Sequence, residues 1–273
     1  MLRGTVNPLD VRALFITHLH GDHCYGVPGL GMTMLGLEKG KERPLLFAPK
    51  GLEECYQGPM GLRGFQTRPI LKPNNRGSIP ENVHYYWISY QRFIVRAVPI
   101  KHTVFCLGYV IEEKPRRGNY NMEKVHAAGL SPGVILGELS AKGSLILDGR
   151  EITAESLMDP PKPPRKIVIL GDTCDPSAIA PIAMDADVLV HEATNLDEER
   201  TVAFTYMHST AGMAGAFAKR INAKNLILTH FSPRNMRGNE YDECVHVRTL
   251  VEQARRAFGK PNVFPAHVSQ GSC

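Results

Sequence analysis

The sequence predicts an α/β protein in which short buried strands alternate with helices. Five apolar runs have the length of a strand, and they lie at residues 11–16, 92–100, 166–170, 187–190 and 225–228. A segment after residue 210 carries apolar residues at helical spacing, with Ala214, Phe217, Ala218 and Ile221 on one face. Histidine or aspartate follows each run, so we expect these side chains to meet beyond the carboxyl ends of the strands.

The first run leads directly into F-I-T-H-L-H-G-D-H at residues 15–23. Gly21 is expected to let the backbone turn tightly, so that His18 and His20 face one point while Asp22 and His23 face another. Imidazole nitrogen and carboxylate oxygen suit zinc, and such a site leaves room for a bridging water. The spacing therefore predicts two metal ions. For a lone histidine, a polar loop with no ligand would be the preferred interpretation.

The four later runs end beside further residues of the same types. These are Lys101-His102, Gly171-Asp172-Thr173, His191-Glu192-Ala193-Thr194 and Thr229-His230-Phe231-Ser232. Taken singly each is a weak signal, because a lone aspartate or histidine after a strand is more often a cap or a turn residue. Their recurrence predicts the second half of the metal site.

Composition agrees with an enzyme of this kind without identifying it. The 273 residues are 43% hydrophobic and 22% charged, which is enough to bury one layered core. No apolar stretch is long enough to span a membrane, and no secretory signal opens the chain. The six cysteines contain no C-x-x-C pair and are expected to be reduced, mostly buried thiols. A net charge of +5 permits a polyanionic substrate but does not require one.

A series of short motifs closely resembles the motifs of tRNase Z. In chain order, the series is H-L-H-G-D-H, the isolated His102, G-D-T, H-E-A-T, H-S-T and T-H-F-S. This family comprises tRNA 3′-processing endonucleases of the metallo-β-lactamase fold, and the likeness runs from Gly4 to about Arg237. The H-E-A-T and H-S-T elements separate it from lactamases, glyoxalases and lactonases of the same fold. The resemblance implies an α/β, metallo-β-lactamase-type αββα sandwich, with two mixed sheets between helix layers.

The resemblance also implies a role for each candidate residue. One zinc ion would be held by His18, His20 and His102, and a second by Asp22, His23 and His230, with Asp172 bridging them. Two such ions would activate water and neutralise charge on a phosphodiester during in-line displacement. The expected catalytic residues are Asp22, which accepts a proton from that water, and His208, which protonates the leaving 3′-oxygen while Glu192 holds its second nitrogen. Ser209 or Thr210 is also expected to cap the following helix.

One stretch is unlike compact core. Residues 112–165 are rich in proline, glycine and charge, and they predict an arm inserted into a single domain that spans 1–273. In tRNase Z the corresponding segment is an exosite that grips tRNA, and residues 129–133 resemble part of its glycine-proline motif, with Val134 where proline would stand. Phosphate contacts are expected from Lys114, Arg116, Arg117 and Lys124. The alternative for any one of these cations is a solvated loop.

The two ends of the chain depart from the family pattern. A glycine-rich hairpin and a D-C-G-E-G-T-Q element are expected before the histidine motif, so the fold is expected to be N-terminally incomplete, with sheet edges left uncovered. Residues 261–273 are expected to lack a final apolar strand. The interpretations are a fragment, a mis-started gene model or a degenerate copy. An upstream targeting segment would lie before Met1. The protein is therefore expected to be intracellular, and its compartment is cytoplasmic, nuclear or organellar.

The sequence therefore predicts a zinc-dependent endoribonuclease that removes the 3′ trailer from precursor tRNA by phosphodiester hydrolysis. Short-form members of the family are homodimers, so a homodimer without membrane association is expected. One alternative is a dizinc hydrolase of small phosphodiesters or other small substrates on the same scaffold. The other is a truncated, inactive tRNA-binding pseudoenzyme, which would bind metal without turnover.

Overall fold

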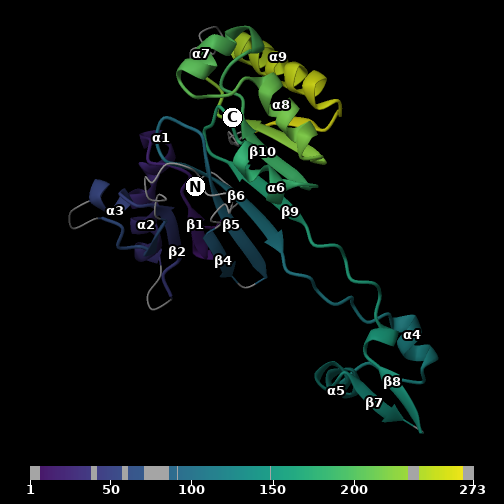
Figure 1. Ribbon diagram of the computed structural model, residues 1–273. Coiled ribbons are helices and arrows are strands. Elements are labelled where there is room, and N and C mark those ends of the chain that lie inside the picture. The colour runs from purple at the N-terminus through teal and green to yellow at the C-terminus, as the bar shows by residue number, and fades with distance from the viewer. Residues whose placement is uncertain are drawn as a thin grey trace. The chain divides into compact units, whose positions relative to one another are not determined.

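The computed structural model describes residues 7–37, 42–56, 61–70, 86–90, 92–147, 149–232 and 240–266. The chain divides into two compact units, one of residues 1–112 with 166–273 and the other of residues 113–165 (Figure 1). The second unit lies within the segment that the sequence assigned to an arm. In the part of the chain described, no helix combines the length and the apolar character that crossing a membrane requires.

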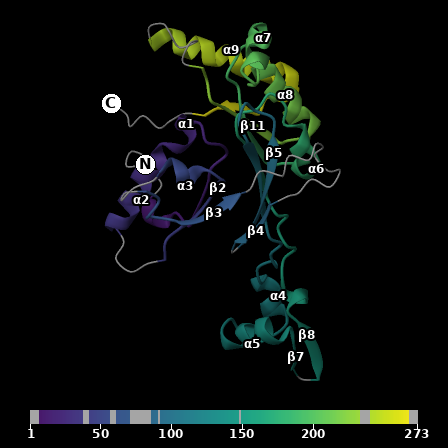
Figure 2. The same cartoon turned by 60° about the vertical axis from the view of Figure 1, so that its left-hand side comes forward.

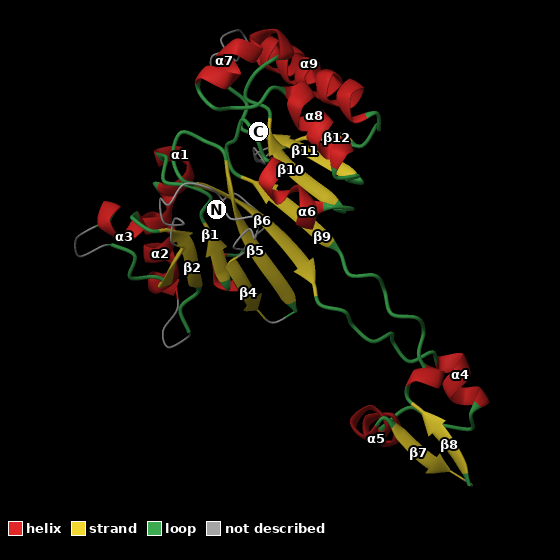
Figure 3. Cartoon of the chain, in the orientation of Figure 1, coloured by secondary structure: helices red, strands yellow, loops and turns green. Residues whose placement is uncertain are grey.

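The larger sheet of the first unit has the strand order β12-β11-β10-β9-β6-β5-β4 (Figure 3). Its strands are β4 (Tyr86–Tyr90), β5 (Phe93–Ile100), β6 (Cys106–Glu113), β9 (Lys166–Leu170), β10 (Val188–Glu192), β11 (Asn225–Thr229) and β12 (Val263–Pro265). Strands β9 to β12 run parallel, whereas β6 pairs antiparallel with β9. The strands expected at 92–100, 166–170, 187–190 and 225–228 are confirmed, although β10 continues through His191 and Glu192 and β11 through Thr229. The expected absence of a last strand is wrong, because Val263 is fully buried and β12 pairs with β11.

The smaller sheet contains β1 (Ala13–Phe15), β2 (Leu45–Pro49) and β3 (Gln66–Ile70). All three described strands are parallel, so the expectation of a second mixed sheet is wrong for them. The reason lies in the connections. Helices α1 (Gly21–Cys24) and α2 (Gly26–Leu37) follow β1, and α3 (Leu52–Cys55) follows β2, and a helical crossover returns the chain in the same direction. Strand β1 is half-buried, not fully buried as expected.

Apolar packing arranges the first unit in four layers. Between the sheets, Phe47 and Ile70 of the smaller sheet share a core with Val95, Leu107 and Tyr109 of the larger one. The outer face of the smaller sheet packs against α1, α2 and α3 through a second cluster. The largest cluster joins the other face of the larger sheet to its helices. These layers form the αββα sandwich expected from the resemblance.

Helices on the outer face of the larger sheet connect its parallel strands. They include α6 (Ala180–Ala183), α7 (Arg200–Thr205), α8 (Ala211–Arg220) and α9 (Glu240–Phe258). Helices α8 and α9 lie side by side in Figures 1 and 2. The expected apolar face of α8 is confirmed, since Ala214, Phe217, Ala218 and Ile221 are all buried. Close packing depends on Gly215, because a Cβ there would lie 2.2 Å from the backbone oxygen of Ala254.

The second unit folds around a small core of its own. It contains α4 (Met122–Ala127), α5 (Val134–Lys142) and a hairpin of β7 (Ser144–Leu147) with β8 (Arg150–Thr153). Val125, Leu139 and Leu157 are among the buried residues of its core. Asn121 begins α4, because its side chain accepts hydrogen bonds from the backbone of Glu123 and Lys124. The segment is therefore a folded unit and not an irregular loop.

Candidate metal centre

The histidine motif occupies the turn between β1 and α1, and backbone hydrogen bonds hold this turn against the larger sheet. Leu107 N donates to Thr17 O at 2.9 Å, and Gly171 N donates to Leu107 O at 3.2 Å. These bonds bring the residues after β1 and after β9 together. Gly171 permits the approach, because a Cβ there would lie 2.7 Å from the Cβ of Thr17.

Gly21 has a different role from the one expected. It does not adopt a positive φ, so the turn does not depend on its backbone freedom. A Cβ at Gly21 would instead lie 2.3 Å from the ring of Tyr25. Glycine leaves space here beside the first helix turn, which carries Asp22 and His23, and a larger residue would require the exposed Tyr25 ring to move.

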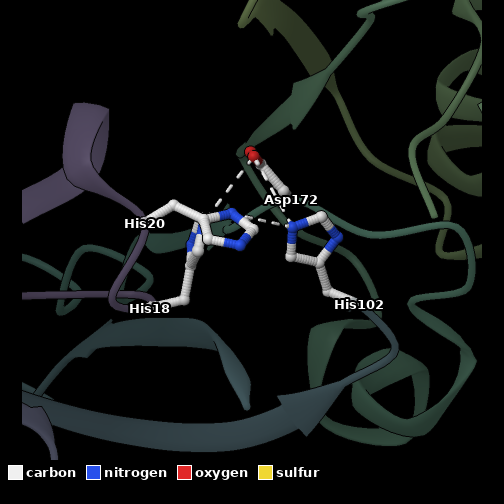
Figure 4. Close-up of side chains that lie close together, drawn as sticks. All are labelled: His18, His20, His102 and Asp172. Atoms are coloured by element: carbon white, nitrogen blue, oxygen red, sulfur yellow. Dashed lines mark hydrogen bonds and ion pairs between the residues drawn. The ribbon is translucent and has the colours of Figure 1, made fainter. Parts of the chain in front are cut away.

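Four ligand-type side chains converge at the first cluster (Figure 4). His18 Nε2 lies 3.1 Å from His20 Nδ1, which lies 3.3 Å from His102 Nε2. Asp172 Oδ2 lies 3.6 Å from His18 Nε2. His18, His102 and Asp172 are at most 9% exposed, so the cluster is largely closed to solvent.

A second cluster lies against the same aspartate and is more open. It contains Asp22, His23 and His230. Asp22 Oδ2 lies 3.1 Å from His23 Nε2 and 3.2 Å from His230 Nε2, and Asp172 Oδ2 lies 3.3 Å from each of these nitrogens. The Asp22 side chain is 64% exposed. Asp172 therefore stands between the two clusters, and the second cluster is the more exposed of the two.

The donor set fits cations. Burial, with the nearby His23, lowers the pKa of His18 to about 3, so this imidazole is neutral and keeps a lone pair for a metal ion. Burial alone would raise the pKa of Asp172, but hydrogen bonding to His23 and the charge of His230 hold it well below its usual value. His23 Nε2 is buried without a hydrogen bond of acceptable geometry, although two carboxylates lie close to it. Convergent nitrogen and oxygen donors of this kind are able to hold metal ions.

His208 lies beside these clusters, in the turn before α8. Its Nδ1 is 3.0 Å from Glu192 Oε1, which also accepts a hydrogen bond from Thr173 N. Burial lowers the pKa of His208, but the hydrogen bond and charge of Glu192 outweigh this and raise it. One nitrogen of His208 also lies within 4.8 Å of ligand atoms of Asp172 and His230. Thus His208 is near enough to act on a group that those residues hold.

The helix after His208 is capped as expected. Thr210 Oγ1 accepts a hydrogen bond from Met213 N, while Ser209 Oγ donates to Thr173 O at 2.6 Å. Thr210 is therefore the cap of α8. Ser209 instead ties the His208 turn to the loop that carries Asp172.

Sequence patterns missed the groups that support the histidines from behind. His18 Nδ1 lies 3.1 Å from Thr17 Oγ1 and 3.6 Å from Cys106 Sγ. His102 Nδ1 lies 2.9 Å from Met207 O, and His230 Nδ1 lies 2.9 Å from Thr194 Oγ1. Such partners fix the orientation and tautomer of a metal-binding imidazole. A hydroxyl residue next to a predicted ligand, as in Thr17-His18, was the one available signal.

Comparisons with known proteins agree with this architecture. A family model described as the metallo-beta-lactamase superfamily matches residues 3–31. Ribonuclease Z of Picosynechococcus sp. is 37% identical over 263 residues, which cover 95% of this chain and 79% of that protein. Ribonuclease Z of Bacillus subtilis is 34% identical over 237 residues, which cover 86% of this chain and 74% of that protein.

Solved structures show the same fold. The short form of human tRNase Z matches with a TM-score of 0.58 and 24% identity, covering 85% of this chain and 77% of that one. YhfI, a metallo-beta-lactamase fold protein from Bacillus subtilis, matches with a TM-score of 0.58 and 16% identity, covering 97% and 79%.

Proposed function

The chain belongs to the ribonuclease Z family, and from this premise we propose that it is a zinc-dependent endoribonuclease that removes the 3′ trailer from precursor tRNA. The observation that carries the proposal is the convergence of seven histidine and aspartate side chains beside the His208–Glu192 pair. A centre of metal ligands with an adjacent proton donor suits hydrolysis of a phosphodiester.

The two clusters suggest how the ligands divide. His18, His20 and His102 would hold one zinc ion, Asp22, His23 and His230 would hold the other, and Asp172 would contact both. When bound, two zinc ions supply an acidified water and neutralise charge on a phosphoryl oxygen. The deep position of the first cluster and the exposure of Asp22 favour binding of the scissile phosphodiester at the second.

The protein's own residues then carry the protons. The Asp22 carboxylate accepts a proton from the attacking water, because it lies in the second cluster and is 64% exposed, within reach of solvent. His208 donates a proton to the leaving 3′-oxygen, since the hydrogen bond and charge of Glu192 raise its pKa and favour the protonated form. Buried Glu192 holds Nδ1, which leaves Nε2 as the donating nitrogen. The bond between phosphorus and the 3′-oxygen breaks, leaving a 3′-hydroxyl on the tRNA and a 5′-phosphate on the trailer.

We further propose that the unit of residues 113–165 is the exosite arm for tRNA. Its two connecting segments line a cavity of about 460 Å³, and the cations there are Lys114, Arg116, Arg117, Lys162 and Arg165. The two acidic residues at this cavity are Glu113 and Asp159, so positive charge is in excess. Such a surface suits phosphates and reads no sequence. Lys124 is exposed but donates to Met158 O at 2.9 Å, so it contributes less freely to RNA binding.

A cleavage assay tests the proposed function. Zinc-loaded protein is incubated with precursor tRNA and, separately, with a chromogenic phosphodiester. We expect cleavage of precursor tRNA at the junction with the trailer, producing a 3′-hydroxyl. Folded, zinc-loaded protein that cleaves the small diester alone would identify a general phosphodiesterase, and one that binds tRNA without any cleavage would identify a pseudoenzyme. Assembly as a homodimer is also proposed, and sedimentation of the full chain measures it.

A further inference from the structure

The hydroxyl of Thr194 lies between a buried carboxylate and a proposed metal ligand. Its Oγ1 is 2.9 Å from His230 Nδ1 and donates a hydrogen bond to Glu192 Oε2. The other oxygen of the same carboxylate, Oε1, faces His208. One glutamate therefore contacts the proposed proton donor directly and a proposed metal ligand through a single hydroxyl.

The hydrogen bonds that link Glu192, Thr194 and His230 determine which ring nitrogen of His230 keeps a lone pair. Glu192 can only accept, so Thr194 Oγ1 donates its proton to Oε2. The same Oγ1 then accepts from His230, which requires the proton of His230 to be on Nδ1. In this tautomer Nε2 has a lone pair, and it is Nε2 that lies 3.2 and 3.3 Å from the carboxylates of Asp22 and Asp172.

Thr194 also contacts the backbone of the residue that it would orient. His230 has a φ of 58°, a left-handed conformation that is unfavourable for a residue with a side chain. Thr194 Oγ1 lies 3.0 Å from His230 O, which is a second acceptor for its one proton, and with that acceptor too Oγ1 accepts from His230 Nδ1. Ala193 N donates to Thr229 O at 2.9 Å. The ends of β10 and β11 are thus joined at the point where His230 is strained.

We propose that Thr194 is a positioning residue that sets the tautomer and orientation of His230, so that Glu192 supports both the second metal cluster and His208. This inference rests on the proposed function, because it assumes that His230 binds metal. Loss of the Thr194 hydroxyl should weaken metal binding at the cluster of Asp22, His23 and His230, while the cluster of His18, His20 and His102 is unaffected.

Zinc affinity tests the proposal through variants of nearly equal size. Thr194→Val removes the hydroxyl and Thr194→Ser keeps it. Thr205→Val is the control, because it removes an exposed hydroxyl that donates to Thr201 O within α7. In chelator competition we expect Thr194→Val to weaken one of two zinc sites by about 10- to 100-fold, the usual effect of losing such a partner. Thr194→Ser should restore most of the affinity, and Thr205→Val should match the parent.

The outcomes separate this inference from the proposed function. A parent protein that binds no zinc would overturn both. A parent with two zinc sites and a Thr194→Val variant with the same two affinities would overturn the role of Thr194 alone. Weakening of both sites equally, or no recovery in Thr194→Ser, would indicate general disruption and also overturn it.

A measurement on the unmodified site remains decisive if Thr194→Val does not fold. Nuclear magnetic resonance of the ring nitrogens in the zinc-loaded parent, with the His230 signals identified by their absence in His230→Gln, reports which nitrogen carries a proton. We expect a protonated Nδ1 and a metal-bound Nε2. A metal-bound Nδ1 would overturn the proposal.

Discussion

Replacing His208 with alanine separates proton donation from metal binding. In the structure Glu192 Oε1 lies 3.0 Å from His208 Nδ1 and orients the ring, and its hydrogen bond and charge raise the pKa of His208, which favours the protonated form that a general acid requires. General acid catalysis contributes about 10²- to 10⁴-fold to a rate. At about 1.4 kcal/mol for each factor of ten, His208→Ala should raise the barrier for precursor tRNA cleavage by roughly 3 to 5 kcal/mol.

The size of the loss should depend on the leaving group. A ribose 3′-oxygen leaves as a strong base and needs a proton, whereas a nitrophenolate is a far weaker base and leaves without one. Single-turnover cleavage of precursor tRNA should therefore fall by the full factor in His208→Ala, while hydrolysis of a bis(nitrophenyl) phosphate should fall much less. Zinc content and tRNA affinity should stay near those of the parent.

The matched control is His126→Ala, because His126 is an exposed histidine in the second unit, outside the metal clusters. It should hydrolyse the small diester at the parent rate. Equal losses on both substrates in a zinc-loaded His208→Ala protein would refute leaving-group protonation. Unchanged cleavage of precursor tRNA would show that His208 has no catalytic role and is only part of the turn before α8.

Three further predictions concern pH, the arm and packing. The pKa of His208 is raised above 6.5. The ratio of the parent rate to the His208→Ala rate on precursor tRNA should therefore be constant at low pH and fall as the pH rises through this pKa. A ratio independent of pH up to 10 would exclude the role of His208 as an acid. Glu113 N donates to Arg165 O at 3.0 Å, so replacing residues 114–164 with Asn-Gly closes a hairpin. This variant should lose tRNA cleavage and show a lower salt dependence of tRNA binding, while it still hydrolyses the small diester. Parallel loss or parallel retention of both activities in folded, zinc-loaded protein would contradict the role of the exosite. Gly215→Ala should lower the free energy of unfolding by about 1 to 3 kcal/mol, because the new Cβ meets the backbone of Ala254. Gly29→Ala should not lower it, because the space around Gly29 is open. Equal unfolding free energies for Gly215→Ala and the parent would contradict the α8–α9 packing.

Local patterns were sufficient to predict the main strands and the helix after Thr210. Apolar runs such as 166–170 and 225–228, each followed by a ligand-type residue, are best interpreted as buried strands that end at the site. By contrast, β12 has only three residues, and Val263 is buried because β11 lies beside it. Such a short strand is stabilised by its neighbour and has no periodic pattern of its own.

The same distinction applies to the site. The histidines and aspartates could be located because strand ends bring them to one edge of the fold. Their supporting groups could not, because those depend on contacts between distant segments. Met207 O faces His102 across 105 residues, and a backbone carbonyl has no sequence signature. Gly21 illustrates a further limit, since the contact that a Cβ there would make with the exposed Tyr25 ring is visible only in the structure.

Zinc content of the purified chain tests the central claim most directly. Native mass spectrometry of the folded parent and of His126→Ala should show about two zinc ions per chain. His18→Ala should lose zinc at the buried cluster and His230→Ala at the open one, and both should lose cleavage of precursor tRNA. A folded parent without zinc, or with zinc that survives His18→Ala and His230→Ala alike, would contradict the account.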